Sequence, residues 1–268
     1  MPAPTVLLTG AAGRIGTLLR DLLPGYGHTL RLLDVRPVEG APDAITADLA
    51  DRDALREAVR GVDAIVHLAG ISLEAPFEKI LRANIEGTYH LYEAAREEGV
   101  RRIVFASSNH AVGHTPLPRD GDPLIPVGTP HRPDTFYGLS KSFGEDLAQL
   151  YWDRHGLETV SVRIGSCFPR PESVRGLSLW LSPADCARLV HAALTAGHVG
   201  HTVVYGSSAN TRLRWDLTSA RALGYEPQDD AEAYAAPIVA AQGEPDPDDP
   251  AQALLGGPFV TDPPIWPH

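Results

Sequence analysis

Short apolar runs alternate with amphipathic stretches between residues 5 and 164. The apolar runs have the length of strands and lie at residues 5–9, 29–33, 44–46, 64–68, 102–106 and 159–164. Between most of them, apolar residues recur every three or four positions, which is the spacing of one helix face. Near-continuous apolar strands separated by helices are typical of a parallel sheet covered on both faces. The pattern therefore predicts an α/β fold with a Rossmann-type doubly wound parallel sheet.

The helical pattern covers residues 15–23, 51–60, 77–98 and 137–155. The helix expected over 77–98 contains Asn84, a poor helix former, which indicates a local kink, a hydrogen-bond network or simply an exposed position. After residue 164 the pattern changes to shorter elements. These are a helix over 183–196, a strand over 201–205 and a helix near 215–223.

Proline recurs in two segments, which we therefore expect to lack long helices and strands. The first spans residues 112–133, and a loop of that length in a compact domain is commonly a functional cover. The second is the tail from Tyr225 onward, which we expect to be mostly irregular and to wrap a surface or a neighbouring subunit.

Composition narrows the class of protein. The chain has 268 residues, of which 43% are hydrophobic and 21% charged, as expected for one compact globular domain. The formal charge is −11 and no basic run exceeds Arg101-Arg102, so we expect neither a nucleic acid nor an anionic membrane as partner. Cys167 and Cys186 do not have the spacing of metal ligands, and we predict no metal site. Two cysteines are too few for a disulfide framework, which suits a reducing cytoplasm. No signal peptide or membrane span is expected.

A glycine-rich turn follows the first strand. Gly10, Gly13 and Gly16 stand between that strand and the first helix, where glycines allow a tight turn, the approach of a pyrophosphate and close packing of helix on strand. The second strand ends in Asp34, whose carboxylate can accept hydrogen bonds from both ribose hydroxyls of an adenosine and would repel a 2′-phosphate. The pattern favours NAD over NADP, although Arg36 could pair with such a phosphate and Asp34 could instead cap a turn.

Tyr137 and Lys141 lie four residues apart on a predicted helix and therefore share one face. A phenol has a pKa of about 10, and a neighbouring cation would lower it toward neutrality and make Tyr137 a proton acceptor. The alternative is a surface helix with a packed tyrosine and a solvated lysine. Residues 107–110, Ser-Ser-Asn-His, end the strand over 102–106, where they could meet a ligand or only satisfy the following loop.

Taken in order, these motifs resemble the extended short-chain dehydrogenase/reductase superfamily. The resemblance rests on Thr9-Gly10-Ala-Ala-Gly13-Arg-Ile-Gly16, Asp34, Asn84, Ser108 and Tyr137-Gly-Leu-Ser-Lys141. Within the superfamily the chain is similar to the uronate dehydrogenases over almost its whole length. That similarity rests on Gly70-Ile-Ser72, Phe105-Ala-Ser-Ser-Asn-His110, Arg163-Ile-Gly-Ser166-Cys167 and Leu177-Ser-Leu-Trp180.

The resemblance implies an enzyme that oxidises C1 of a hexuronic acid, such as galacturonate or glucuronate, with NAD to give an aldarolactone. It implies that Tyr137 is the base, that Lys141 lowers its pKa and holds the nicotinamide ribose, and that Ser108 holds the reacting hydroxyl. It also implies that Asn84 helps to position the lysine through water.

The same resemblance supplies the remaining candidate site residues. The cofactor-binding candidates are Gly10, Gly13, Arg14, Ile15, Gly16, Asp34, Asp48, Leu49, Leu68, Ala69, Gly70, Tyr137 and Lys141. The substrate-binding candidates are Ser72, Ser108, Asn109, His110, Tyr137, Ser166 and Arg175. Arg175 would pair with the sugar carboxylate, although a solvated loop arginine is the plain alternative. His110 would contact the sugar or serve as a structural imidazole.

Residues 1–160 would mainly form the NAD-binding core, and residues 161–268 the small substrate-binding portion and tail. Ser108 lies 29 positions before Tyr137, so its role depends on how the proline-rich loop folds back. The part after Tyr137 is short for a nucleotide-sugar enzyme, which favours a small free sugar acid. Two alternatives remain: an NAD-dependent nucleotide-sugar epimerase or dehydratase, and a non-catalytic NAD(P)-sensing protein. A homo-oligomer is plausible, and the sequence does not rank galacturonate against glucuronate.

Overall fold

A computed structural model describes residues 3–119 and 121–263. Its centre is a sheet of seven parallel strands in the order β3-β2-β1-β4-β5-β6-β7. The strands are β1 (Thr5–Thr9), β2 (Thr29–Asp34), β3 (Ile45–Thr46), β4 (Ala64–His67), β5 (Arg102–Ser108), β6 (Glu158–Ile164) and β7 (His201–Gly206). The chain progresses outward from β1 in both directions, so the predicted doubly wound sheet is confirmed.

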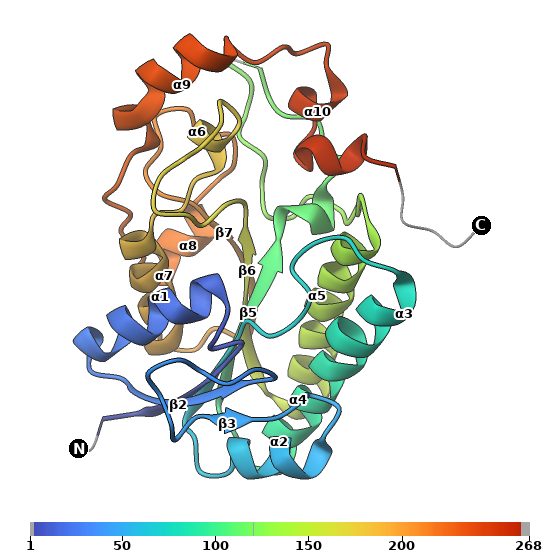
Figure 1. Cartoon of the computed structure of the whole chain (residues 1–268), viewed down its shortest axis with the longest axis vertical. Coiled ribbons are helices and arrows are strands. Elements are labelled where there is room, and N and C mark those ends of the chain that lie inside the picture. Colours follow the sequence, from blue (N-terminus) through green and yellow to red (C-terminus); the bar gives the residue numbers. More distant parts are fainter. Residues whose placement is uncertain (1–2, 120, 264–268) are drawn as a thin grey trace.

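Helices cover both faces of the sheet (Figure 1). One face carries α1 (Arg14–Leu22) and α7 (Pro183–Thr195), and the other carries α2 (Arg52–Val59), α4 (Gly87–Glu97) and α5 (Phe136–His155). Successive strand residues point to opposite faces. Accordingly, Val6 and Leu8 of β1 join the apolar core under α1 and α7, whereas Leu7 joins the core under α2, α4 and α5.

Asn84 interrupts the helix expected over 77–98. The segment consists of α3 (Phe77–Ile80), a π-helical turn (Leu81–Glu86) and α4. Asn84 is only 4% exposed. Its side-chain oxygen accepts a hydrogen bond from the N–H of Ile71 at 2.7 Å, and its amide nitrogen donates to the carbonyl of Ile71 at 2.9 Å and to the hydroxyl of Ser140 at 3.0 Å. The network interpretation is therefore confirmed and the exposed one is wrong.

The prediction of a mostly irregular tail is wrong in part. The tail contains α9 (Ala235–Gln242), α10 (Pro250–Ala253) and two 3₁₀ turns (Ala231–Tyr234 and Gly257–Val260), while the predicted helix near 215–223 is only α8 (Thr218–Ala222). Short α6 (Gly176–Leu179) was not predicted. Pro250 is the first residue of α10, and Pro237 lies in the first turn of α9. Proline is tolerated there because the first N–H groups of a helix have no partner within it. Residues 264–268 of the predicted tail lie outside the described residues.

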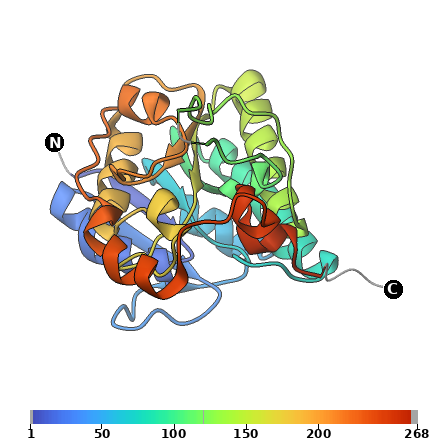
Figure 2. The same ribbon diagram turned by 90° about the horizontal axis from the view of Figure 1, so that it is seen from above.

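The tail folds back onto the proline-rich loop of the same chain. Leu117 N–H donates to the carbonyl of Ala253 at 2.8 Å, and Leu255 N–H donates to that of Thr115 at 2.9 Å. Leu255 also shares a buried apolar cluster with Ile125 and Trp215. These segments lie at the end of the molecule where β5 and β6 terminate, and Figure 2 looks onto that end. Within the described residues, no helix is both long and apolar enough to cross a bilayer.

A buried ion pair joins α5 to β6. Glu145 accepts two hydrogen bonds from the guanidinium of Arg163, at 2.9 and 2.7 Å, and others from Ser107 and His131. Burial raises the pKa of Glu145, but the hydrogen bonds from His131 and Arg163, with the charge of Arg163, outweigh it and hold the pKa at about 2. Because the folded-state pKa lies below the usual 4.5, the ionised pair stabilises the fold above about pH 4.5.

We expect Glu145→Gln to lower the free energy of unfolding by about 3 to 5 kcal/mol at pH 7, because Arg163 would remain buried without its charge partner. The loss should shrink as the pH falls from about 4.5 toward 2, where Glu145 of the unmodified chain gains its proton. Urea denaturation at several pH values measures both effects. Glu57→Gln is the control, since the side chain of Glu57 is 69% exposed and forms a surface ion pair with Arg60. An equal effect of the two substitutions would contradict the prediction.

Candidate active site

The candidate residues meet at the carboxyl ends of the strands. The order of strands diverges between β1 and β4, and ligands of doubly wound sheets bind outside the strand ends at this point. Ser108 ends β5, and Tyr137 lies in the first turn of α5, which starts at the same end. The structure therefore brings the glycine turn, the Ser108 strand end and the Tyr137 helix to one edge of the sheet.

The glycine turn is closely packed. Gly10 has a φ of 73°, and a Cβ on it would lie 2.7 Å from the backbone nitrogen of Ala69. A Cβ on Gly16 would lie 2.2 Å from the Gly10 carbonyl oxygen, so only glycine lets α1 approach the turn. Gly13 precedes Arg14 at the start of α1, where no side chain caps the free N–H groups. Those groups can bind an anion.

Asp34 braces this turn from the end of β2. One carboxylate oxygen accepts a hydrogen bond from the N–H of Ala12 at 2.9 Å, and the other accepts from the N–H of Arg36, also at 2.9 Å. The Arg36 guanidinium lies 3.7 Å away, but its side chain is 67% exposed. Each carboxylate oxygen has a second lone pair, so Asp34 can brace the turn and still accept from a ligand hydroxyl.

The other cofactor candidates border the same edge. Ala69 and Gly70 follow β4, and a Cβ on Gly70 would lie 2.9 Å from the side-chain oxygen of Asn84. Leu49 is buried against Gly87. Asp48 is more peripheral, since its half-exposed carboxylate lies 3.8 Å from the exposed guanidinium of Arg82 and accepts a hydrogen bond from the N–H of Ala50. The remaining candidates at this edge are Arg14, Ile15 and Leu68. The guanidinium of Arg14 lies 4.2 Å from the centre of the Phe168 ring.

Glu74 and Thr135 fix the first turn of α5. The two carboxylate oxygens of Glu74 accept hydrogen bonds from the N–H groups of Tyr137, at 2.9 Å, and Phe136, at 3.2 Å. The Thr135 hydroxyl caps the same turn by accepting from the N–H of Gly138 at 3.0 Å. A carboxylate satisfies otherwise unpaired donors at a helix N-terminus and is favoured by the helix dipole. The backbone of Tyr137 is thus held from outside its own helix.

Burial changes the ionisation of both residues of the Tyr-Lys motif. It raises the pKa of Tyr137 to about 12, while a hydrogen bond with Ser108 opposes this rise and the charge of Asp134 adds to it. It lowers the pKa of Lys141 to about 8. The ammonium group donates to the carbonyl of Ala106 at 2.7 Å and lies 5.5 Å from the centre of the Tyr137 ring. The pKa of Tyr137 is raised rather than lowered in the chain alone, and the effect of Lys141 on it stays a prediction.

Two candidates for the substrate bind the same carbonyl group of the tail. Asn109 is fully buried and donates to the Leu255 carbonyl at 2.8 Å, and Arg175 donates to it through Nη2 at 2.5 Å. The Nε atom of Arg175 is buried without a hydrogen bond in the described residues, where Arg175 also forms no ion pair. Burial lowers the pKa of Arg175 to about 10. A partly desolvated guanidinium of this kind favours an anionic ligand.

His110 is held on both sides. Its ring stacks on Phe259 of the tail, with 4.3 Å between ring centres, and meets the Tyr137 ring edge-on at 5.7 Å. Its Nδ1 atom lies 2.7 Å from a carboxylate oxygen of Asp134. Ser72 is exposed in the loop after β4, and half-buried Ser166 is fixed through its backbone beside α6, so both are less closely tied to this cluster.

Sequence reasoning missed four residues of this site: Glu74, Asp134, Leu255 and Phe259. Asp134-Thr135 directly precedes the helix and is a recognisable capping signal. The other three contact residues far away in the sequence, so no local pattern indicates them. Glu74 lies 62 positions from Phe136, Leu255 lies 146 positions from Asn109, and Phe259 lies 149 positions from His110.

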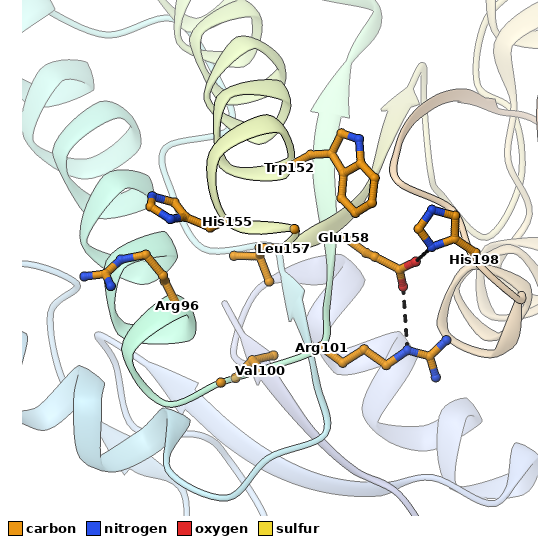
Figure 3. A pocket seen from close by; sticks show the side chains of 10 residues that line it. Arg96, Val100, Arg101, Trp152, His155, Leu157, Glu158 and His198 are labelled. Atoms are coloured by element: carbon orange, nitrogen blue, oxygen red, sulfur yellow. Dashed lines mark ion pairs between the residues drawn. The ribbon is translucent and has the colours of Figure 1, made fainter.

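A hollow of about 510 Å³ lies at the opposite end of the sheet (Figure 3). It is lined by residues at the amino ends of β5 and β6 and the last turn of α5, among them Arg101, Trp152 and Glu158. Glu158 is already shared by Arg101, Arg102 and His198, so its charge is balanced within the chain. This hollow is separate from the Tyr137 cluster.

The family is shown by comparison with known proteins. Residues 6–177 match the model of the NAD dependent epimerase/dehydratase family. The chain is 50% identical to a uronate dehydrogenase of Pseudomonas syringae, over 98% of this chain and 96% of that protein.

Solved structures agree in fold. The crystal structure of a uronate dehydrogenase from Agrobacterium tumefaciens is 45% identical, covers both chains completely and superposes with a TM-score of 0.92. A mutant of that enzyme complexed with NAD is also 45% identical, over 97% of this chain and 98% of its own, with a TM-score of 0.90. The chain therefore belongs to the NAD dependent epimerase/dehydratase family, and within it to the group of uronate dehydrogenases.

Proposed function

We propose that the chain catalyses the NAD-dependent oxidation of C1 of a hexuronic acid, such as galacturonate or glucuronate, to the aldarolactone. The near-full-length similarity to uronate dehydrogenases supports this reaction class. The observation that carries the proposal is the carbonyl of Leu255, to which both Arg175 and Asn109 donate, because Asn109 directly follows Ser108 at the end of β5. The Nε atom of Arg175 is buried and has no hydrogen bond within the described residues. The proposed proton acceptor and the proposed carboxylate partner thus lie at one edge of the sheet.

The residues present fit NAD. Glycine at positions 10 and 16 lets the turn and α1 pack closely, since a Cβ at either position would overlap backbone atoms, and the free N–H groups at the start of α1 suit a pyrophosphate. The carboxylate of Asp34 suits two ribose hydroxyls and opposes a 2′-phosphate. Lys141 keeps ammonium protons beyond the one donated to Ala106, and these can reach the nicotinamide ribose.

Tyr137 acts as the base in this proposal. When bound, NAD accepts the hydride that leaves C1 of the sugar. Tyr137, as phenolate, takes the proton of the C1 hydroxyl, while the Ser108 hydroxyl holds the C1 oxygen. A pKa of about 12 leaves very little phenolate at neutral pH, so positive charge beside the ring is needed. Lys141, with a pKa of about 8, is still mostly protonated at pH 7 and provides that charge.

Arg175 binds the sugar carboxylate in this proposal. A charge-assisted contact contributes about 1.5 to 3 kcal/mol, which separates uronates from neutral aldoses by roughly tenfold to a hundredfold or more. Asn84 acts indirectly, since it ties Ile71 to Ser140, next to Lys141. Ser72, Asn109, His110 and Ser166 complete the sugar site.

The proposed division of labour follows the chain. Residues 1–160 contribute mainly to the NAD site, and residues 161–268 contribute Ser166, Arg175 and the tail to the substrate site. We expect the enzyme in the cytoplasm, and a homo-oligomer stays a prediction.

We expect NADH to form with galacturonate or glucuronate and NAD, and kcat/KM for galactose to be about tenfold to a hundredfold lower. Absorbance at the NADH band, with both uronates, galactose and UDP-glucuronate each offered with NAD and NADP, measures this. No NADH with either uronate would defeat the proposal. Turnover of UDP-glucuronate by protein that retains NAD through purification would favour the epimerase or dehydratase alternative.

Tyr137→Phe should lower kcat/KM for the uronate by about 10² to 10⁴, because the ring then has no proton acceptor. Its affinity for NAD should change little. Steady-state assays and NAD titration separate the two effects, and Tyr89→Phe is the control because Tyr89 is exposed on α4. Survival of all activity in Tyr137→Phe would show that Tyr137 is not the base. NAD binding without turnover of any offered substrate by the unmodified chain would leave the non-catalytic NAD(P)-sensing alternative.

Asp34→Ala should reduce the preference for NAD over NADP by about tenfold or more, because the charge that opposes a 2′-phosphate is removed. Kinetic constants with each cofactor, measured beside those of Asp43→Ala on the exposed loop that follows β2, test this. An unchanged ratio would mean that Asp34 does not face the ribose.

A further inference from the structure

Asp134 is a buried carboxylate in a space made by glycines. Its side chain has no exposed surface. A Cβ on Gly113 or Gly256 would overlap one carboxylate oxygen, at 1.9 and 2.0 Å, and a Cβ on Gly138 would lie 2.9 Å from the other. The three glycines come from the proline-rich loop, the tail and α5. Segments far apart in sequence thus converge on this one group.

The carboxylate determines which ring nitrogen of His110 carries a proton. One oxygen of Asp134 accepts from the hydroxyl of Thr135 at 2.9 Å, and the other faces Nδ1 of His110 at 2.7 Å. An ionised carboxylate only accepts hydrogen bonds, so Nδ1 must be the donor. In a neutral imidazole Nε2 is then an acceptor. Within residues 3–119 and 121–263, Nε2 makes no hydrogen bond.

We propose that Asp134 is a positioning residue that fixes His110 as a hydrogen-bond acceptor, and that this pair selects substrates with a second hydroxyl beside the reacting C1 hydroxyl. The inference rests on the proposed oxidation of a sugar acid. The ring of His110 cannot swing away, because Phe259 stacks on it and Tyr137 meets its edge. A substrate without that hydroxyl leaves Nε2 buried and unpaired, which costs binding energy.

A competing route runs through Arg175. The charge of Asp134 raises the pKa of the Arg175 guanidinium and also that of Tyr137, so it acts on both groups through space. Asp134 also touches the cap of α5 through Thr135. These routes do not involve His110, so a test must show that Asp134 acts through the imidazole.

A double-mutant cycle makes this distinction. Asp134→Asn offers one acceptor oxygen instead of two and turns a donor toward His110 or Thr135, and His110→Phe keeps the stacked ring without its nitrogen atoms. Each should raise KM for the uronate about tenfold and leave KM for NAD within about twofold. The double variant should match His110→Phe. Asp146→Asn is the matched control, because Asp146 lies 3.6 Å from the imidazole of His131 but is 76% exposed.

Independent effects of the two substitutions would overturn the proposal. If Asp134→Asn raises KM for the uronate by the same factor in the His110→Phe variant as in the unmodified chain, Asp134 acts by another route. A 2-deoxyuronate and the parent acid should be discriminated by the unmodified chain and about tenfold less by His110→Phe. Equal discrimination by both would likewise overturn it.

Nitrogen-15 NMR of the imidazoles tests the proton position without substrate. His110→Phe identifies the signal that disappears, and we expect that signal to show a protonated Nδ1 and an unprotonated Nε2. A proton on Nε2 would overturn the inference even if Asp134→Asn fails to fold. Failure of the proposed function is a separate result, since it would appear as absent turnover in the unmodified chain with this NMR signature intact.

Discussion

The first turn of α5 is the constraint on which the site depends. A helix leaves its first N–H groups without partners, and here Glu74 and Thr135 satisfy those of Phe136, Tyr137 and Gly138. Glu74 comes from the loop after β4, which also carries Ala69 and Gly70 beside the glycine turn. The backbone of Tyr137 is therefore tied through Glu74 to the loop that borders the glycine turn, so the proposed base and the proposed NAD site are held by one set of contacts.

Burial and charge oppose each other throughout the site. Exclusion of water pushes Tyr137 toward the neutral phenol and Lys141 toward the neutral amine, which is the reverse of what catalysis by a phenolate requires. Glu145 shows the other outcome, because there the donors of His131 and Arg163 overcome burial. For Tyr137, the hydrogen bond with Ser108 opposes burial without overcoming it, and the charge of Asp134 adds to the effect of burial. In the chain alone the pKa of Tyr137 therefore stays above its usual value.

The sequence predicted what is periodic or local. The sheet, the helices that cover it, the glycine turn, Asp34 and the Tyr137-Lys141 pair all follow from spacing within short segments, and the structure brings them together. Asn84 is an unusual residue for a helix interior, but its hydrogen bonds go to Ile71 and Ser140, which no local pattern connects to it. The proline-rich composition predicts an irregular tail, whereas Pro237 and Pro250 lie in the first turns of α9 and α10, which tolerate proline. Glu74 and Phe259 depend on tertiary contacts alone.

The carbonyl of Leu255 has a consequence for how the proposed sugar site tolerates sequence change. Asn109 and Arg175 both donate to this main-chain group, and every residue type supplies a carbonyl at position 255. Replacement of the side chain at position 255 would therefore keep the shared acceptor, whereas a shift in the path of the backbone would remove it from both donors at once. The link between the two segments is thus encoded in the course of the main chain rather than in one side chain.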